Sequence, residues 1–162
     1  IDAGVSKLII PGYDYETSKL ALEIANKYPF VYASIGYHPT EIKVTLEAAR
    51  QKYPDKKIIA VFKPNTYSRT EKFYKEFADS LNIADKTYLT EIDCNRERPE
   101  DYPGVNSNMI VLGLKDGSII SEETINKLGG ELNSVICFMG CASVAGLVES
   151  LKKLIDEMVV EE

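Results

Sequence analysis

A single histidine, His38, stands in a chain of 162 residues. Zinc and two-metal hydrolase sites usually take several imidazole ligands, so this count argues against both kinds of site. Cysteines are few as well: Cys94, Cys137 and Cys141 are an odd number and form no Cys-x-x-Cys pair. A disulfide framework is therefore not expected.

Long apolar runs are missing too. Nowhere do about 18 apolar residues follow one another, as a membrane-spanning helix requires, and the start Ile1-Asp2-Ala3-Gly4 has no basic region or signal-peptide core. These absences predict a cytoplasmic protein without a membrane partner. The 25 acidic residues against 19 basic ones give a formal charge of −6. Since a negative field repels phosphate backbones, nucleic-acid binding is disfavoured.

The apolar residues that are present, 44% of the chain, suffice for one compact core. We predict a single domain over residues 1–162. Short β-branched runs alternate with longer segments of helical spacing, which indicates repeated strand–helix units. The runs that we expect to form strands are Lys7–Ile10, Val31–Ile35, Ile58–Phe62, Thr87–Ile92, a weaker Ser118–Ile120, and Val135–Met139.

Most of these runs are apolar throughout, which favours strands covered on both faces by helices. The predicted fold is α/β with three layers (αβα), Rossmann-like or flavodoxin-like, around a mainly parallel sheet of five or six strands. A capping box formed by Ser68 and Glu71 predicts that one helix begins at Ser68. The expected helical stripes are Leu20, Ile24 and Tyr28; Ile42, Leu46, Ala49 and Tyr53; Phe73, Phe77 and Leu81; and Val144, Leu147, Leu151, Leu154, Ile155 and Met158.

Loops that follow parallel strands gather at the carboxyl edge of the sheet, where ligands usually bind. The longest is irregular and rich in proline and glycine, Asn95–Gly117, with one short helix expected at Asn108–Leu114. Carboxylates at this edge suggest a hydrolase-like pair, with helix caps and solvated charges as the plainer alternative. The carboxylates concerned are Asp14, Glu41, Glu91 and Asp93.

The thiols offer a second hypothesis for the same edge. Two of the three cysteines together with His38 would hold a soft metal, whereas the plainer alternative makes the thiols small buried hydrophobic groups. For His38 itself we favour an imidazole that hydrogen-bonds backbone near a strand end.

Two segments carry a more specific pattern: His38-Pro39-Thr40-Glu41-Ile42, and Ala60 to Thr70, which is AVFKPNTYSRT. They resemble the C-terminal domain of the Mur ligases that join alanine to UDP-N-acetylmuramic acid, with His-His-Pro-Thr-Glu-Ile and then Phe-Gln-Pro-His-Thr-Tyr-Ser-Arg-Thr. The resemblance covers about residues 38 to 162. It implies that the substrate's amino acid or adjoining phosphate is bound by His38, Thr66, Ser68 and Arg69.

The chain departs from that family at several positions. Tyr37 stands in place of the family's first histidine, Asn65 in place of another, and Gly140–Ser143 lacks the family's aspartate. Whole Mur ligases bind ATP with a phosphate loop in a separate domain, and no Gly-x-x-x-x-Gly-Lys-Ser/Thr loop occurs here. We therefore predict no catalytic residue, no metal and no cofactor, and expect that the chain is not an enzyme.

The first part of the chain has another likeness. Residues 3–12 and Val31–Pro39 resemble a βαβ fragment of TatD-type metal-dependent deoxyribonucleases, which are β/α barrels, although the TatD metal ligands are missing. The two resemblances meet at His38-Pro39, which predicts a barrel-derived fragment over residues 1–38 and a ligase-like part over residues 39–162. By analogy with the ligase domain, the strand order would be 1-2-6-3-4-5, with right-handed crossovers.

These observations lead to a main hypothesis of an engineered or recombined α/β scaffold without an intact catalytic site. The alternative is a Mur ligase domain fragment that retains weak binding of an amino-acid or UDP-muramoyl ligand. A flavodoxin-like mononucleotide binder, with its ligand at Gly12–Asp14, is disfavoured by the missing phosphate loop. We expect a monomer, with a dimer through an exposed edge strand as the other option.

Overall fold

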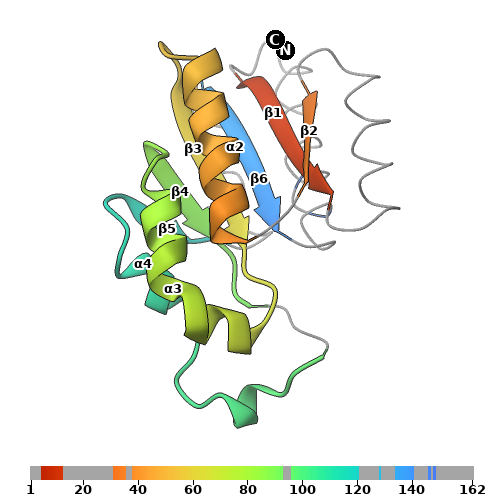
Figure 1. Cartoon of the computed structure of the whole chain (residues 1–162), viewed down its shortest axis with the longest axis vertical. Helices are drawn as coiled ribbons and strands as arrows, with labels where there is room; N and C mark the ends of the chain where they lie inside the picture. Colours follow the sequence, from red (N-terminus) through yellow and green to blue (C-terminus); the bar gives the residue numbers. More distant parts are fainter. Residues whose placement is uncertain are drawn as a thin grey trace, which may run out of the picture.

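From Val31 to Ile119, strands and helices alternate along the described part of the chain, as the apolar pattern predicted (Figure 1). The structure, a computed structural model, describes residues 5–12, 31–35, 38–92, 96–120, 128, 134–140, 146 and 148, the first two ranges by their backbone alone. The elements are β1 (Val5–Gly12), β2 (Val31–Ile35), α2 (Pro39–Lys52), β3 (Lys57–Lys63), α3 (Tyr67–Leu81), β4 (Lys86–Leu89), the 3-10 helix η1 (Pro99–Asp101), α4 (Asn108–Val111), β5 (Gly117–Ile119) and β6 (Ser134–Gly140). Each predicted strand overlaps an observed one, and α4 confirms the short helix expected within the long loop.

The six strands form one sheet in the order β2-β1-β6-β3-β4-β5, and every neighbouring pair is parallel. The predicted α/β class with a parallel sheet is thus confirmed. The predicted order 1-2-6-3-4-5 is wrong, because β1 rather than β2 pairs with β6, with Leu8 opposite Ile136.

The exchange of β1 and β2 changes how the sheet is wound. In the predicted order each step from β1 to β5 moves in one direction, so right-handed crossovers would place all their helices on one face. In the observed order the step from β1 to β2 runs opposite to the step from β2 to β3. The same rule associates such a reversal with crossovers on both faces, which suits strands that are apolar throughout.

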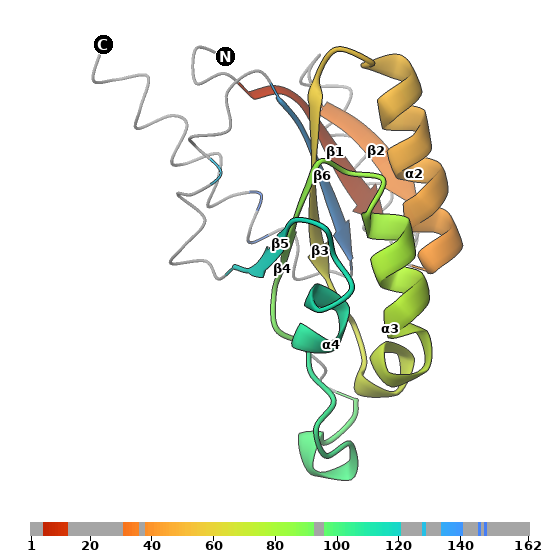
Figure 2. The same cartoon turned by 90° about the vertical axis from the view of Figure 1, so that its left-hand side faces the viewer.

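Burial at the centre of the sheet shows that both of its faces are covered. Successive side chains of a strand point to opposite faces, and every residue of β6 is buried, as are Ile58–Phe62 of β3. Helices α2 and α3 lie side by side along one of these faces (Figure 2). The core between them and the sheet consists of Ile42, Leu46, Ala49, Ile58, Ala60, Phe62, Phe77, Ala78, Leu81, Leu89, Ile110, Val135, Cys137 and Met139.

Helix α2 begins at Pro39 because the residue before it caps the helix. The backbone of His38 is extended, its Nδ1 accepts from the Thr40 N–H at 3.5 Å, and its own N–H donates to Glu41 Oε2 at 2.6 Å. This reciprocal pair is a capping box, and proline suits the first helical position. The stripe of buried Ile42, Leu46 and Ala49, with half-buried Tyr53, is as predicted.

Helix α3 begins at Tyr67, so the predicted start at Ser68 is wrong. Thr66 has the extended backbone of a cap (φ −142°, ψ 150°), and its hydroxyl oxygen accepts from the Arg69 N–H at 3.3 Å. Two hydroxyl residues lie two positions apart here, and the later one is already inside the helix. The Ser68-to-Glu71 spacing fits a capping box, but the Ser68 hydroxyl has a different partner, described below.

At the amino edge of the sheet, Asp85 joins three elements. Its Oδ2 accepts from Arg50 Nη2 at 2.7 Å and from the Ile58 N–H at 2.7 Å. Arg50 also donates to the carbonyl oxygens of Lys56 and Ile83. Partial burial tends to raise the pKa of Asp85, but the hydrogen bonds from Ile58 and Arg50 and the charges of Arg50 and Lys57 outweigh it, so the pKa is lowered.

Some predictions fall outside the described residues, namely the first and last helical stripes and all statements on Asp14, Tyr37, Asp93, Cys94, Cys141, Ala142 and Ser143. Of the helices that the structure describes, none has the length and apolar character needed to span a bilayer.

Candidate functional site

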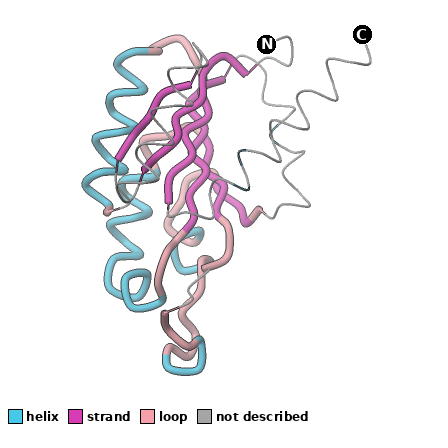
Figure 3. Tube along the Cα trace, turned by 90° about the vertical axis from the view of Figure 1, so that its right-hand side faces the viewer, coloured by secondary structure: helices cyan, strands magenta, loops and turns pink. Residues whose placement is uncertain are grey.

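The ligase-like turn lies at the carboxyl edge of the sheet, between the end of β3 and the start of α3. The strands all run toward this edge, and the loop that carries η1 extends beyond it (Figure 3). Thr66 ends the turn and caps α3, while Tyr67, Ser68 and Arg69 form the first turn of that helix. Three of the four predicted ligand-binding residues, Thr66, Ser68 and Arg69, are therefore together in one place.

Glu97, which follows β4 in the chain, is bound to this first turn of α3. Its Oε2 accepts from the Ser68 N–H at 3.0 Å, and its Oε1 accepts from the Ser68 hydroxyl. A further bond comes from the Tyr67 N–H. Slight burial tends to raise the pKa of Glu97, but these hydrogen bonds, with the nearby Arg69 charge, lower it overall.

The first turn of α3 therefore uses its backbone donors within the chain. The N–H groups of Tyr67 and Ser68 donate to Glu97, and that of Arg69 donates to Thr66. A helix start normally offers such groups to an anion. Here the anion is a carboxylate of the protein itself, so an external ligand meets the side chains of the turn rather than its amides.

The loop that carries Glu97 is fixed at two further points. The ring of Tyr102 stacks on that of Tyr67, with centroids 6.0 Å apart and planes 14° from parallel. At the end of the loop, the buried Ser107 hydroxyl donates to the Thr90 carbonyl oxygen at 2.7 Å. The loop is thus attached both to α3 and to the end of β4.

His38 approaches the same edge from α2. Its ring packs edge-on against Phe73 of α3, with centroids 5.1 Å apart. Phe73 is one helical turn beyond Arg69, and α3 bends there, since Phe73 has non-helical angles (φ −125°, ψ 15°). The imidazole does bond to backbone, as predicted, and the donor is the Thr40 N–H in the first turn of α2 rather than a group of a strand.

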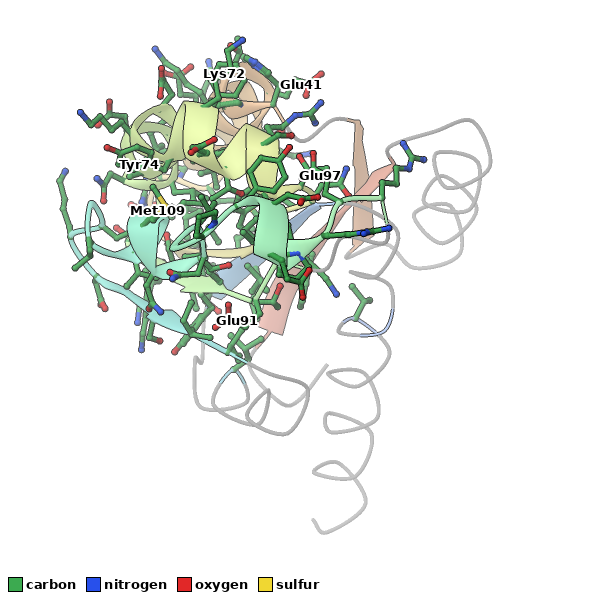
Figure 4. The ribbon with its side chains drawn as sticks, turned by 90° about the horizontal axis from the view of Figure 1, so that it is seen from below. Glu41, Lys72, Tyr74, Glu91, Glu97 and Met109 are labelled. Atoms are coloured by element: carbon green, nitrogen blue, oxygen red, sulfur yellow. The ribbon has the colours of Figure 1, made fainter. Side chains whose placement is uncertain are left out.

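The two other hypotheses for this edge receive no support from the described residues. Glu41 lies on the helical side of the sheet and Glu91 beyond its other side (Figure 4), and Glu41 is used in capping α2. Cys137 is fully buried in β6, which raises its thiol pKa to about 12, as fits the small hydrophobic group of the plainer alternative. Within the part of the chain that the structure describes, no three histidine, cysteine or acidic residues are grouped to hold a metal.

Reasoning from the sequence missed Glu97, although it identified the turn that Glu97 holds. The two partners are 29 residues apart, beyond the reach of any local spacing rule. The available signal was the charged run Arg96-Glu97-Arg98 after a strand that ends at the carboxyl edge. Such a run usually indicates a solvated face, so it did not stand out.

Comparison with known proteins places this arrangement in a family. Residues 22–160 match the family model described as Mur ligase, glutamate ligase domain. The UDP-N-acetylmuramate–L-alanine ligases of Lactobacillus helveticus and Levilactobacillus brevis are 39% and 41% identical over 121 and 124 residues. These alignments cover 74% and 76% of this chain but 27% and 28% of the relatives, so the chain spans about a quarter of their length.

Two solved structures share the fold. The UDP-N-acetylmuramate-alanine ligase from Thermotoga maritima superposes with a TM-score of 0.57 at 19% identity, over 81% of this chain and 26% of that one. A murein peptide ligase from Psychrobacter arcticus gives 0.53 at 20% identity, over 75% and 25%. At these identities the likeness concerns the fold alone.

These comparisons correct two expectations. The expectation that the chain is not an enzyme is contradicted, because its relatives are named ligases and its match is to one part of them; a phosphate loop missing from such a part decides nothing about the whole. The hypothesis of an engineered chimera is not supported, and the family model already begins within the segment assigned to the barrel fragment. The chain belongs to the family of the Mur ligase glutamate ligase domain.

Proposed function

We propose that the chain acts as the C-terminal domain of a UDP-N-acetylmuramate–L-alanine ligase and binds the muramoyl substrate at the carboxyl edge of its sheet. The proposal is supported by relatives of that name at about 40% identity. The single observation that carries the site is the gathering of Thr66, Ser68 and Arg69 in one capped turn at that edge.

The ligand chemistry suits this turn. A muramoyl substrate carries carboxylate and phosphate groups, and a guanidinium binds either with two parallel hydrogen bonds. We assign this role to Arg69, with the Thr66 hydroxyl beside it and the His38 imidazole arriving from α2. Ser68 joins them only when Glu97 releases its hydroxyl, since that group already has an acceptor.

The ATP-dependent step needs groups that this chain does not carry. The family resemblance assigns the phosphate loop to a separate domain, and no such loop occurs among these 162 residues. The proposed contribution of the chain is to hold and orient the muramoyl substrate, which lowers the entropic part of the barrier for a partner domain.

Calorimetric titration with UDP-N-acetylmuramate, the muramoyl substrate of such a ligase, tests the proposal. We expect saturable binding that weakens about tenfold or more in Arg69→Ala, as loss of a bidentate charged contact implies. Lys115→Ala removes the same charge beside β5 at the amino edge and should leave the affinity unchanged. The absence of saturable heat in the wild type, or equal affinities in all three proteins, would contradict the proposal.

The remaining predictions from the sequence keep that status. One is that residues 1–162 form a single domain whose two parts meet near His38, and another is that residues 1–38 derive from a barrel. The others are a cytoplasmic location and a monomer that binds neither nucleic acid nor membranes. An edge-strand dimer is the alternative to the monomer, and sedimentation of the purified chain distinguishes the two.

A further inference from the structure

One acidic side chain reaches the proposed binding turn from a distant part of the chain. Glu97 uses both of its carboxylate oxygens on Ser68 and also accepts from Tyr67. The cap from Thr66 reaches only the Arg69 N–H, at 3.3 Å. The Ser68 and Tyr67 donors of this helix start are therefore used by Glu97. Thr66 accepts from Arg69 and Thr70, and Figure 4 shows Glu97 beside the helix.

The shape of α3 makes this contact more important. The helix bends at Phe73, so the segment Tyr67–Lys72 is set off from the rest of α3, and Figure 2 shows the bend at its lower end. Beyond the bend, Phe77 and Leu81 are buried and anchor the helix to the core. Before it, residues 67–69 are only half-buried, and the one buried residue of the segment, Thr70, donates its hydroxyl to the Thr66 carbonyl oxygen at 2.8 Å. Packing therefore fixes the later turns, while the first turn depends on polar contacts.

We propose that Glu97 is a positioning residue, which holds the first turn of α3 so that the Arg69 side chain faces the ligand. The contribution to ligand binding rests on the proposed function; the hold on the turn does not. Glu97 also couples the turn to the loop of residues 96–107, because the same loop is attached through Tyr102 and Ser107. A displacement of the turn should then also displace the loop, and a displacement of the loop should displace the turn.

The rate of cleavage by trypsin measures, without any ligand, how firmly Glu97 is bound to the first turn of α3. The Arg96–Glu97 bond is a trypsin site at the contact itself, whereas Arg98 precedes a proline and is not cleaved. Ser68→Ala removes the hydroxyl donor and leaves the cleaved sequence unchanged. Cleavage after Arg96, followed by mass spectrometry, should accelerate about tenfold, as the loss of a charge-assisted hydrogen bond implies.

An NMR signal tests the positioning more directly. The Arg69 Nε–H resonance, assigned through Arg69→Lys, should shift in Glu97→Gln and in Ser68→Ala. Glu100→Gln makes the same change of charge at an exposed position of η1 and should leave the resonance in place. An unmoved resonance in both variants and unchanged cleavage in Ser68→Ala would overturn the proposal.

The ligand arm uses UDP-N-acetylmuramate with the wild type, Glu97→Gln and Glu100→Gln. Affinity about tenfold weaker in Glu97→Gln alone supports the positioning role. Equal affinity in all three proteins overturns it. If the wild type binds no ligand while the Arg69 resonance still moves, the hold on the turn is supported and the proposed function fails, so the two failures are told apart.

Discussion

Two carboxylates at opposite edges of the sheet make similar bonds to different kinds of structure. Asp85, at the amino edge, accepts from Ile58 in β3 and from Arg50 in α2. Glu97, at the carboxyl edge, accepts from Ser68 in the first turn of α3. Both have a lowered pKa, yet the first joins packed elements and the second joins a loop to a helical turn.

The difference separates a contact between packed elements from a contact to which we have assigned a role in ligand binding. Elements that Asp85 joins are held by the core as well, since Ile58 and the α2 residues Leu46 and Ala49 are buried. They move only when the protein unfolds, so the Asp85 contact should contribute to global stability. The turn that Glu97 holds has little packing of its own, and its contact should instead set the population of a locally open state.

The largest expected effect on stability belongs to Asp85→Ala. It leaves the N–H of a buried strand residue, Ile58, without its side-chain acceptor, which costs about 1 to 3 kcal/mol of unfolding free energy. Asp85→Asn retains one acceptor oxygen and should cost less. Urea denaturation measures both, and a loss under about 0.5 kcal/mol in Asp85→Ala would show that the contact is not structural.

Of the two carboxylates, Asp85 should account for the larger share of the dependence of global stability on pH. Their folded pKa values lie below the ordinary values of 3.8 for Asp85 and 4.5 for Glu97. Their stabilisation is therefore complete at pH values above the ordinary range and is lost as the pH falls through the lower folded values. We expect the unfolding free energy, measured by urea denaturation, to decline as the pH falls from about 7 to about 2.5. This decline should be shallower in Asp85→Asn than in the wild type.

Salt provides the check on that pH prediction. Both side chains are partly exposed, so added salt should screen their charges, as it does for surface ion pairs. The contribution of these carboxylates to the pH dependence of stability should therefore become smaller. A decline with falling pH that is equally steep in the wild type and Asp85→Asn would contradict the assignment to this residue.

Cys137 distinguishes global from local opening. Its thiol lies in the central strand, and burial raises its pKa to about 12, so alkylation at neutral pH should occur only in unfolded molecules. Asp85→Ala should accelerate both alkylation of Cys137 and cleavage after Arg96. Ser68→Ala should accelerate the cleavage alone, and faster alkylation in that variant would show that Glu97 supports the global fold. Peptide mapping separates Cys137 from the other thiols.

The smallest expected effect is that of Glu97→Gln on global stability, below about 0.5 kcal/mol, because the side chain lies at the surface of a loop. Urea denaturation beside Glu100→Gln measures it. A loss comparable to that of Asp85→Ala would remove the distinction between the two edges.

Local patterns predicted much of the fold. Pro39 and Glu41 after His38 specify where α2 begins, and the apolar run at Ile58–Phe62 specifies a buried strand, since each signal lies within a few residues of its effect. The order of β1 and β2 was not predictable in this way. Both runs are apolar, and which one pairs with β6 is decided by contacts with residues more than a hundred positions away.

The candidate site was predictable in part for the same reason. Its turn, with Thr66 and Arg69, was recognisable from neighbouring residues, but the choice of cap between two hydroxyl groups depends on the partner of Ser68. That partner, Glu97, comes from another loop, and a charged residue in an irregular segment gives no sign of what it will contact.

Amide NMR with UDP-N-acetylmuramate compares the two edges in one measurement. We expect saturable shifts at Thr66–Thr70 and at Glu97, and none at Ile83–Asp85. Saturable shifts confined to the amino edge, or no saturable shift at either edge, would contradict the claim that the turn held by Glu97 is where this domain meets its ligand.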